Sequence, residues 1–170
     1  IADLRSMMGI VSQDAILFND SVFNNICLGK NKATKKEVIA AAKTANAHEF
    51  IMQMEEGYSS KIGDGGNKLS GGQKQRISIA RAFIRNPQIL IFDDCLSAVD
   101  TETEDHILSH LKKMIQSCTS IIISHRISSI KHAEQIIVLD EGHITEQGTH
   151  QQLLQKQGVY FEMHQQQLVE

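Results

Sequence analysis

Two short stretches of this sequence combine residue types and spacings that could do chemistry. In the first, Ser70 precedes Gly71 and Gly72, and Gln73 completes the spacing of a capping box at a helix start. Glycine leaves the unpaired N–H groups of a first helical turn open to close approach, and the helix dipole adds about half a positive charge there. We therefore predict that this helix tip binds an anion such as a phosphate group.

The second stretch places two carboxylates directly after an apolar run. Residues 89–92 are all apolar, the pattern of a parallel strand covered on both faces, and Asp93 and Asp94 follow at its carboxyl end. Carboxylate oxygens at this edge of a parallel sheet are suited to holding Mg²⁺ and to orienting a water molecule. The pattern predicts a magnesium and water site there.

The elements that must position these stretches follow from ordinary patterns. The helix from Ser70 is predicted to stop at Asn86-Pro87, because proline lacks an N–H donor and restricts the residue before it. Its apolar stripe consists of Ile77, Ala80, Phe83 and Ile84. The other expected elements are a strand over 8–11, helices over 34–48 (with a capping box from Thr34) and 50–54, an irregular loop over 61–67, a helix capped by Thr101, a buried strand over 121–123, a hairpin over 135–146, and helices from Thr149 and over 159–168.

Composition and charge fit a globular domain and exclude several classes of protein. The chain has 170 residues, 41% of them hydrophobic, and a formal net charge of −3, which gives no general attraction to nucleic acid or anionic lipid. Cys27, Cys95 and Cys118 are an odd number without metal-type spacing, so we interpret them as reduced thiols. No apolar run approaches the ~18 residues of a membrane span, so any membrane connection is expected to run through another segment or subunit.

The order and spacing of these motifs resemble those of an ATP-binding cassette (ABC) ATPase. Leu69 to Gln73 is similar to the signature motif of that family, the strand ending in Asp93-Asp94 to its Walker B strand, and Ser97 to Asp100 to its D-loop. His125, which follows the last predicted buried strand, resembles the switch histidine of the H-loop. Residues 13–26 resemble the Q-loop and following segment of exporter-type cassettes.

The resemblance implies roles for individual residues. Cassette domains pair head to tail, so that the signature motif of one domain closes over ATP on the P-loop of the other. The Q-loop glutamine of the family reaches Mg²⁺ or the attacking water, and the switch histidine contacts the terminal phosphate. The resemblance thus assigns ATP binding in trans to Ser70, Gly71, Gly72 and Gln73, catalysis to Asp94, His125 and Gln13, magnesium binding to Asp93 and Gln13, and a dimer contact to Asp100, with ATP and Mg²⁺ as cofactors.

The implied fold class is α/β. It is an incomplete parallel sheet of the P-loop NTPase type, with an inserted α-helical signature subdomain and a C-terminal β-hairpin plus helix. The expected division is a Q-loop region over 1–26, a helical subdomain with the signature helix over 27–86, a sheet core with the Walker B, D-loop and H-loop motifs over 87–148, and C-terminal helices over 149–170. Residues 61–67 occupy the place of the X-loop, where a contact between subunits and a flexible lead-in to the signature helix are alternative interpretations.

The sequence departs from the family pattern in two places. A P-loop has the form G-x-x-x-x-G-K-[ST], and the only Gly-Lys pair, Gly29-Lys30, has Asn24 and Asn31 at the other required positions, so it is rejected. We expect the chain to be part of a longer polypeptide and, alone, to leave apolar surface uncovered, to be marginally stable and to bind ATP weakly or not at all. The family usually has glutamate in place of Asp94, and aspartate is one methylene shorter, so the chain's own site is expected to be slow.

Three classes of function remain open at this point. The leading one is the ATPase module of an exporter, bound to a transmembrane domain at the cytoplasmic face of the cell membrane and paired with an identical or a different cassette domain. The alternatives are a non-transport cassette protein and a non-catalytic fragment that only completes a partner's site. The exporter-like segment over 13–26 and the Thr149-His150 ending favour transport, and the acidic balance argues against a nucleic-acid partner.

Overall fold

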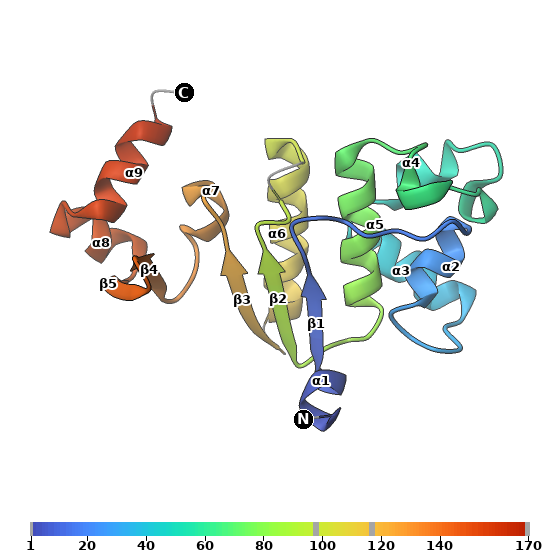
Figure 1. Ribbon diagram of the computed structural model, residues 1–170, viewed down its shortest axis with the longest axis horizontal. Helices are drawn as coiled ribbons and strands as arrows, with labels where there is room; N and C mark the ends of the chain where they lie inside the picture. The colour runs from blue at the N-terminus through green and yellow to red at the C-terminus, as the bar shows by residue number, and fades with distance from the viewer. Residues whose placement is uncertain (1, 97–98, 116–117, 169–170) are drawn as a thin grey trace. The chain divides into compact units, whose positions relative to one another are not determined.

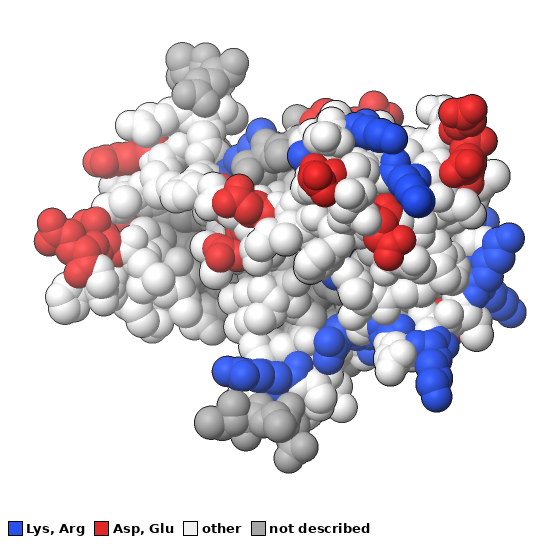
Figure 2. All heavy atoms as spheres, turned by 45° about the vertical axis from the view of Figure 1, so that its right-hand side comes forward, with Lys and Arg blue, Asp and Glu red and all other residues white. Residues whose placement is uncertain are grey.

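The computed structural model describes residues 2–96, 99–115 and 118–168, which fall into two compact units, 1–123 and 124–170 (Figure 1). Each unit has its own hydrophobic core. The finer four-part division expected from the sequence stays a prediction. Figure 2 shows acidic and basic side chains spread over one face, in places side by side, with wide uncharged areas, in keeping with the small net charge of −3.

The first unit is built on a parallel sheet of three strands (Figure 1). The strands are β1 (Met8–Val11), β2 (Ile89–Asp93) and β3 (Thr119–Ile123), in the order β1-β2-β3. Ile10 of β1 pairs with Ile91 of β2, which pairs with Ile121 of β3. Because the strands are parallel, their carboxyl ends meet at one edge of the sheet.

One face of this sheet is covered and the other is largely open. Leu90 and Phe92 are buried, whereas Ile10, Ile121 and Ile123 are 57%, 47% and 51% exposed. The expectation of a buried strand is therefore wrong for β3, whereas in β2 Ile91 is half-buried. Alternate residues of a strand point to opposite faces, so Leu90 and Phe92 lie on the covered face and Ile91 on the other.

Helix α5 (Gly71–Phe83) is the long helix that follows Ser70, and its sequence pattern is confirmed. Ser70 and Gln73 form the predicted capping box. The helix ends at Phe83, three residues before Asn86. All four residues of the predicted stripe are buried: Ile77, Ala80, Phe83 and Ile84. Burying an isoleucine or phenylalanine side chain stabilises a fold by about 1.5–3 kcal/mol, so this stripe fixes the helix on the core.

Helices α2 (Val22–Cys27) and α3 (Lys35–Thr44) pack against α5. Gly29 lies just after α2, and a Cβ atom at this position would collide with the main-chain oxygen of Arg81 in α5. The glycine therefore allows close helix packing. Close packing therefore explains why glycine stands at position 29, in the Gly29-Lys30 pair that was rejected as a P-loop.

The remaining helices of the first unit include four corrections to the sequence-based expectation. They are α1 (Ala2–Met7), α4 (His48–Met52), the 3₁₀ turns η1 (Gly57–Ser59) and η2 (Asp64–Gly66), and α6 (Thr101–Ile115). The helix α1 and the turns η1 and η2 were not expected. Thr101 does not cap α6 but begins it, and the carboxylate of Asp100 accepts the N–H of Thr103 at 2.9 Å. Aspartate is as good an N-cap as threonine, so the cap shifts by one residue.

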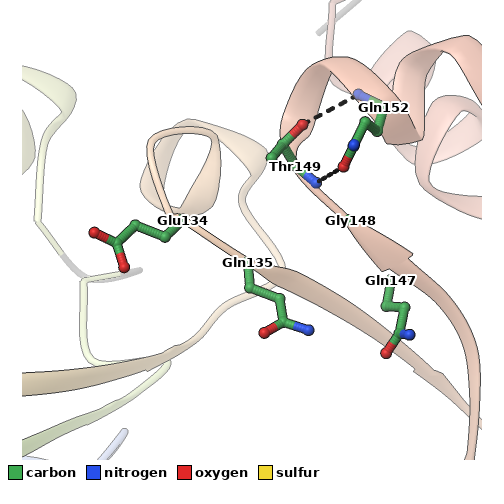
Figure 3. Close-up of a pocket in the computed structure, with 6 residues that line it drawn as sticks. All are labelled: Glu134, Gln135, Gln147, Gly148, Thr149 and Gln152. Atoms are coloured by element: carbon green, nitrogen blue, oxygen red, sulfur yellow. Dashed lines mark hydrogen bonds between the residues drawn. The ribbon is translucent and has the colours of Figure 1, made fainter.

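Over its described residues, 124–168, the second unit contains a hairpin and three helices. Its elements are α7 (Ile127–Ile130), β4 (Ile136–Asp140), β5 (His143–Gly148), α8 (His150–Lys156) and α9 (Val159–Gln167). β4 and β5 pair antiparallel, as the sequence predicted, and Thr149 and Gln152 form a capping box at the start of α8 (Figure 3). No helix among the described residues of the chain has the length and apolar character needed to span a membrane.

Candidate functional site

The tip of α5 is held in shape by its own side chains and faces solvent. The Ser70 hydroxyl accepts the N–H of Gln73 at 3.3 Å, and the Gln73 side chain accepts the N–H of Ser70 at 3.0 Å. Ser70 and Gly71 are exposed, and Gly72 is half-buried. The tip is thus open to an anion of another molecule, because no described part of the chain covers its first glycine.

Gln75, which sequence reasoning missed, connects α5 to the segment that follows β1. Its side chain is 3% exposed, and its amide nitrogen donates a hydrogen bond to the main-chain oxygen of Gln13. The side chain of Gln13 lies at the surface. The available signal was helical spacing, because Gln75 precedes the buried Ile79 by four positions and therefore lies on the same face.

Arg81, two turns further along α5, holds the next part of the same segment. Its guanidinium donates to the main-chain oxygens of Asn25 and Ile16 at 2.9 and 2.8 Å, and to the side-chain oxygen of Asn25 at 3.1 Å. Asn25 is fully buried, and its amide also exchanges two hydrogen bonds with the main chain of Phe18. The held segment leaves Ile16 and Phe18 68% and 55% exposed, which makes an apolar surface.

Asp93 and Asp94 lie where the sequence places them, at the carboxyl end of β2. Asp93 is exposed, and the neighbouring strand β1 ends two residues before Gln13. Asp94 has a φ of 44°, in the left-handed region, and its N–H donates to the main-chain oxygen of Ile123 at 2.8 Å. Asp and Asn adopt this backbone conformation more readily than other residues with side chains.

Asp100 lies within range of the charge of Arg76 in α5 and also caps α6. The N–H of Thr103 and, more weakly, the charge of Arg76 hold the pKa of the Asp100 carboxyl below its ordinary value. Arg76 belongs to α5, donates to the main-chain oxygen of Asn46 at 2.9 Å, and stacks on the ring of Phe50. Burial lowers the pKa of Arg76, and the charge of Asp100 opposes this effect. Ser97 and Ala98, the first half of the predicted D-loop, lie outside the described residues.

His125 belongs to the second unit and has an exposed side chain. Its main-chain oxygen accepts a hydrogen bond from the amide of Gln167 at 2.6 Å. Sequence reasoning missed Gln167, which was included only in a surface helix.

Comparisons with known proteins decide the family. The family model described as ABC transporter matches residues 1–97, which is more than half of the chain. The chain belongs to the ABC transporter family. Two relatives, from Staphylococcus aureus strains NCTC 8325 and COL, carry the name "Putative multidrug export ATP-binding/permease protein" and are 52% identical over 157 residues. A solved structure, of a bacterial Atm1-family ABC exporter with ATP bound, matches 99% of this chain with a TM-score of 0.96 and 46% sequence identity.

The chain spans 27% of the length of these two Staphylococcus aureus relatives and 30% of the exporter chain. The structural match confirms the predicted fold class, a nucleotide-binding domain of the ABC exporter type. Membership of the family implies ATP binding.

The residues at the carboxyl ends of β1 and β2 fit the Mg²⁺ that commonly accompanies ATP. Asp93 offers an exposed carboxylate and Gln13 an exposed amide, and Mg²⁺ is usually held by one or two carboxylates together with nucleotide phosphates. Among the described residues no group of three His, Cys, Asp or Glu side chains could hold a metal by itself. The oxygen donors of this ABC domain therefore fit a cation that arrives with a nucleotide.

Cys95, the residue after the carboxylate pair, is excluded as a metal ligand or nucleophile of this domain. Burial raises the pKa of its thiol to about 12, and the charges of Asp94 and Asp93 act in the same direction. A thiol binds metal and attacks electrophiles only as thiolate. The carboxylates of Asp93 and Asp94 stay the predicted site residues at this strand end.

A hollow of about 320 Å³ in the second unit is lined by none of the predicted site residues (Figure 3). Its lining consists of Glu134, Gln135, Gln147, Gly148, Thr149 and Gln152. None of these residues belongs to the signature, Walker B or Q-loop motifs, so the hollow is not part of the candidate site of this ABC domain.

Proposed function

We propose that this chain is part of the ATPase module of a membrane exporter. The observation that carries the proposal is the position of α5, which has an exposed, capped tip at Ser70 and holds the segment from Gln13 to Phe18 through Gln75 and Arg81. One rigid helix thus connects an anion-binding tip to a segment with exposed apolar side chains. Such a connection is suited to coupling nucleotide binding to a partner that covers Ile16 and Phe18.

In the proposed assembly two cassette domains pair head to tail, as a homodimer or a heterodimer. Ser70, Gly71, Gly72 and Gln73 bind the phosphates of ATP that the partner domain holds, and Asp100 contacts that domain. At the chain's own site, Asp93 and Gln13 hold Mg²⁺, and Asp94 and His125 act on the attacking water and the terminal phosphate. The apolar surface at Ile16 and Phe18 binds the transmembrane domain at the cytoplasmic face of the membrane.

The chain's own site is proposed to be slow. Asp94 reaches about one methylene less far than the glutamate usual in the family, and general-base catalysis, worth roughly 10²- to 10⁴-fold, depends on reach. The signature motif is intact, so this chain serves its partner's nucleotide better than its own. In a heterodimer the signature motif and Asp94 thus predict unequal sites, whereas in a homodimer both sites would be equal and slow.

The test places a charge on the helix tip of the full-length protein. Gly71→Asp repels phosphate but stabilises the helix, because an acidic side chain in the first turn interacts favourably with the helix dipole. We expect ATP turnover to fall at least about tenfold without a fall in thermal midpoint. The matched control is Gln151→Asp, which makes the same charge change at an exposed position in the first turn of α8. If Gly71→Asp and Gln151→Asp had equal ATP turnover, the signature helix would not belong to the proposed site.

A second candidate function is a non-catalytic chain that only completes a partner's site. The absence of G-x-x-x-x-G-K-[ST] from the sequence favours it for the chain alone, and the open sheet face with Ile10, Ile121 and Ile123 supports marginal stability of the isolated chain. Titration of labelled ATP into purified monomer tests the second candidate, because micromolar affinity would contradict it, whereas weak binding by the isolated chain is expected of both. Stimulation of ATP turnover in a P-loop-bearing cassette subunit by the chain would support the second candidate.

A non-transport cassette is the remaining alternative. The coding sequence upstream of Ile1 distinguishes it from an exporter, since the exporter proposal requires membrane spans there or in a separate partner subunit.

A further inference from the structure

The side-chain amide of Gln167, near the end of α9, pairs with the main chain on both sides of Arg126. Its nitrogen donates to the oxygen of His125 at 2.6 Å, and its oxygen accepts the N–H of Ile127 at 2.9 Å. Arg126 between them is extended, with φ −91° and ψ 123°. The amide therefore takes the place that a neighbouring strand would take beside one extended residue.

A third hydrogen bond completes the support of this loop. The hydroxyl of Ser124 accepts the N–H of Arg126 at 3.0 Å. The oxygen of His125 and the N–H groups of Arg126 and Ile127 are thus all bonded, while the imidazole of His125 is exposed. The backbone that carries the imidazole is fixed, and the ring itself faces outward.

Gln167 is held in place because α9 is anchored at its other end. Tyr160 is 1% exposed, and its hydroxyl lies 2.8 Å from a ring nitrogen of His150. The carboxylate of Glu146 accepts the N–H groups of Val159 and Tyr160 at 2.7 and 3.3 Å. Tyr160 and Gln167 are seven residues apart, which is about two helical turns, so the anchor and the amide lie on the same face of α9.

We propose that Gln167 is a positioning residue that holds His125 ready to contact the terminal phosphate of ATP. The proposal rests on the role given to His125 under the proposed function. Without the amide, the two bonds that fix the backbone around Arg126 are lost, and the imidazole spends less time in its working position. The C-terminal helix is then a part of the catalytic apparatus and not only a surface element.

The test uses the full-length protein, four single variants and one double variant. Gln167→Ala removes both bonds, Gln167→Glu keeps the acceptor for Ile127 but not the donor to His125, and Gln166→Ala is the matched control on the exposed neighbour. His125→Ala measures the role of the histidine itself. The readouts are kcat and KM for ATP, together with hydrogen exchange at the Ile127 amide.

We expect Gln167→Ala to lower kcat about three- to tenfold with KM for ATP changed less than about twofold, and to speed exchange at Ile127. Gln167→Glu should lower kcat but protect Ile127. Gln166→Ala should change neither. In the His125→Ala background, Gln167→Ala should cause no further loss, because a positioning residue acts only through the group it positions.

The outcomes separate the two proposals. If His125→Ala leaves turnover unchanged, the role of His125 fails and the inference fails with it. If His125→Ala lowers turnover but Gln167→Ala matches Gln166→Ala, the inference alone is overturned. A further loss from Gln167→Ala in the His125→Ala background would also overturn it, because the effect would then lie elsewhere.

Discussion

The side-chain amide of Gln75 donates a hydrogen bond to the main-chain oxygen of Gln13, which lies 62 positions earlier in the sequence. This bond joins α5, the predicted signature helix, to the segment that carries Gln13, the predicted Q-loop glutamine. The amide oxygen of Gln75 is buried and has no hydrogen-bond partner among the described residues. Buried polar atoms are nearly always hydrogen-bonded. Substitutions of Gln75 therefore measure how an unpaired buried oxygen affects stability.

Gln75→Leu is expected to change the free energy of unfolding of the complete cassette domain by less than about 1 kcal/mol. The substitution removes one hydrogen bond, but it also removes the unpaired buried oxygen, and the two effects oppose each other. Gln75→Ala should cost more, about 1–3 kcal/mol, because it leaves a cavity as well. Urea unfolding measures the free energy of unfolding of both variants. Equal losses for leucine and alanine would contradict the proposed effect of the unpaired oxygen.

Arg81→Lys is expected to destabilise the complete cassette domain by about 1.5–3 kcal/mol. Lysine cannot reproduce the planar fork that bonds Asn25 and Ile16 at once, and Asn25 would keep a buried amide with fewer partners. The matched control is Arg85→Lys, because Arg85 is exposed and makes a single 3.3 Å bond to Ser6. The control should cost less than about 0.5 kcal/mol in the same urea titration.

Local features of this chain could be predicted from the sequence, whereas features that depend on distant partners could not. The capping boxes at Ser70 and Thr34 were predicted and confirmed, because a cap involves residues three positions apart. The bond from Gln75 to Gln13 spans 62 positions, and the bond from Gln167 to His125 spans 42. Nothing in the local pattern specifies such a partner.

Burial was predicted less well than secondary structure for the same reason. Ile121 and Ile123 have strong strand propensity, and they do form a strand, but their exposure depends on which elements cover the sheet. The roles of Asp94 and His125 came from the resemblance to a family rather than from the residues alone. Both roles stay predictions, which the substitutions of Asp94 and His125 test.

Cys95 is expected to resist alkylation in the folded protein. Burial raises its thiol pKa to about 12, and its side chain is 1% exposed, so little thiolate forms and reagents cannot reach it. Treatment with iodoacetamide at pH 8, followed by mass spectrometry, should label Cys95 only after denaturation. Rapid labelling of the native protein at this cysteine would show that the strand end opens.

Glu37 is expected to make stability depend on pH in the acid range. Hydrogen bonds from Lys30 and from Thr34 lower the pKa of the Glu37 carboxyl from 4.5 to about 2. Because the folded-state pKa is lowered, the contribution of Glu37 is fully present above about pH 4.5 and is lost as the pH falls towards 2. Glu37→Gln should therefore lower the thermal midpoint at pH 7 and make it depend less on pH between 4.5 and 2. A midpoint difference from wild type that stays the same at both ends of this range would contradict the assignment.

Asp94→Glu in the full-length protein is expected to raise the rate of ATP turnover. The longer side chain restores the reach that the family usually has, and correct placement of a general base is worth up to roughly 10²- to 10⁴-fold. The gain should come with a small loss of thermal stability, because Asp94 has a φ of 44° and glutamate tolerates left-handed backbone less well than aspartate. Asp94→Asn is the matched control, since asparagine keeps the length and tolerates the same backbone but cannot accept a proton. Turnover that rises with glutamate and falls with asparagine identifies residue 94 as a short general base, whereas equal rates for all three residues would show that the water is activated elsewhere.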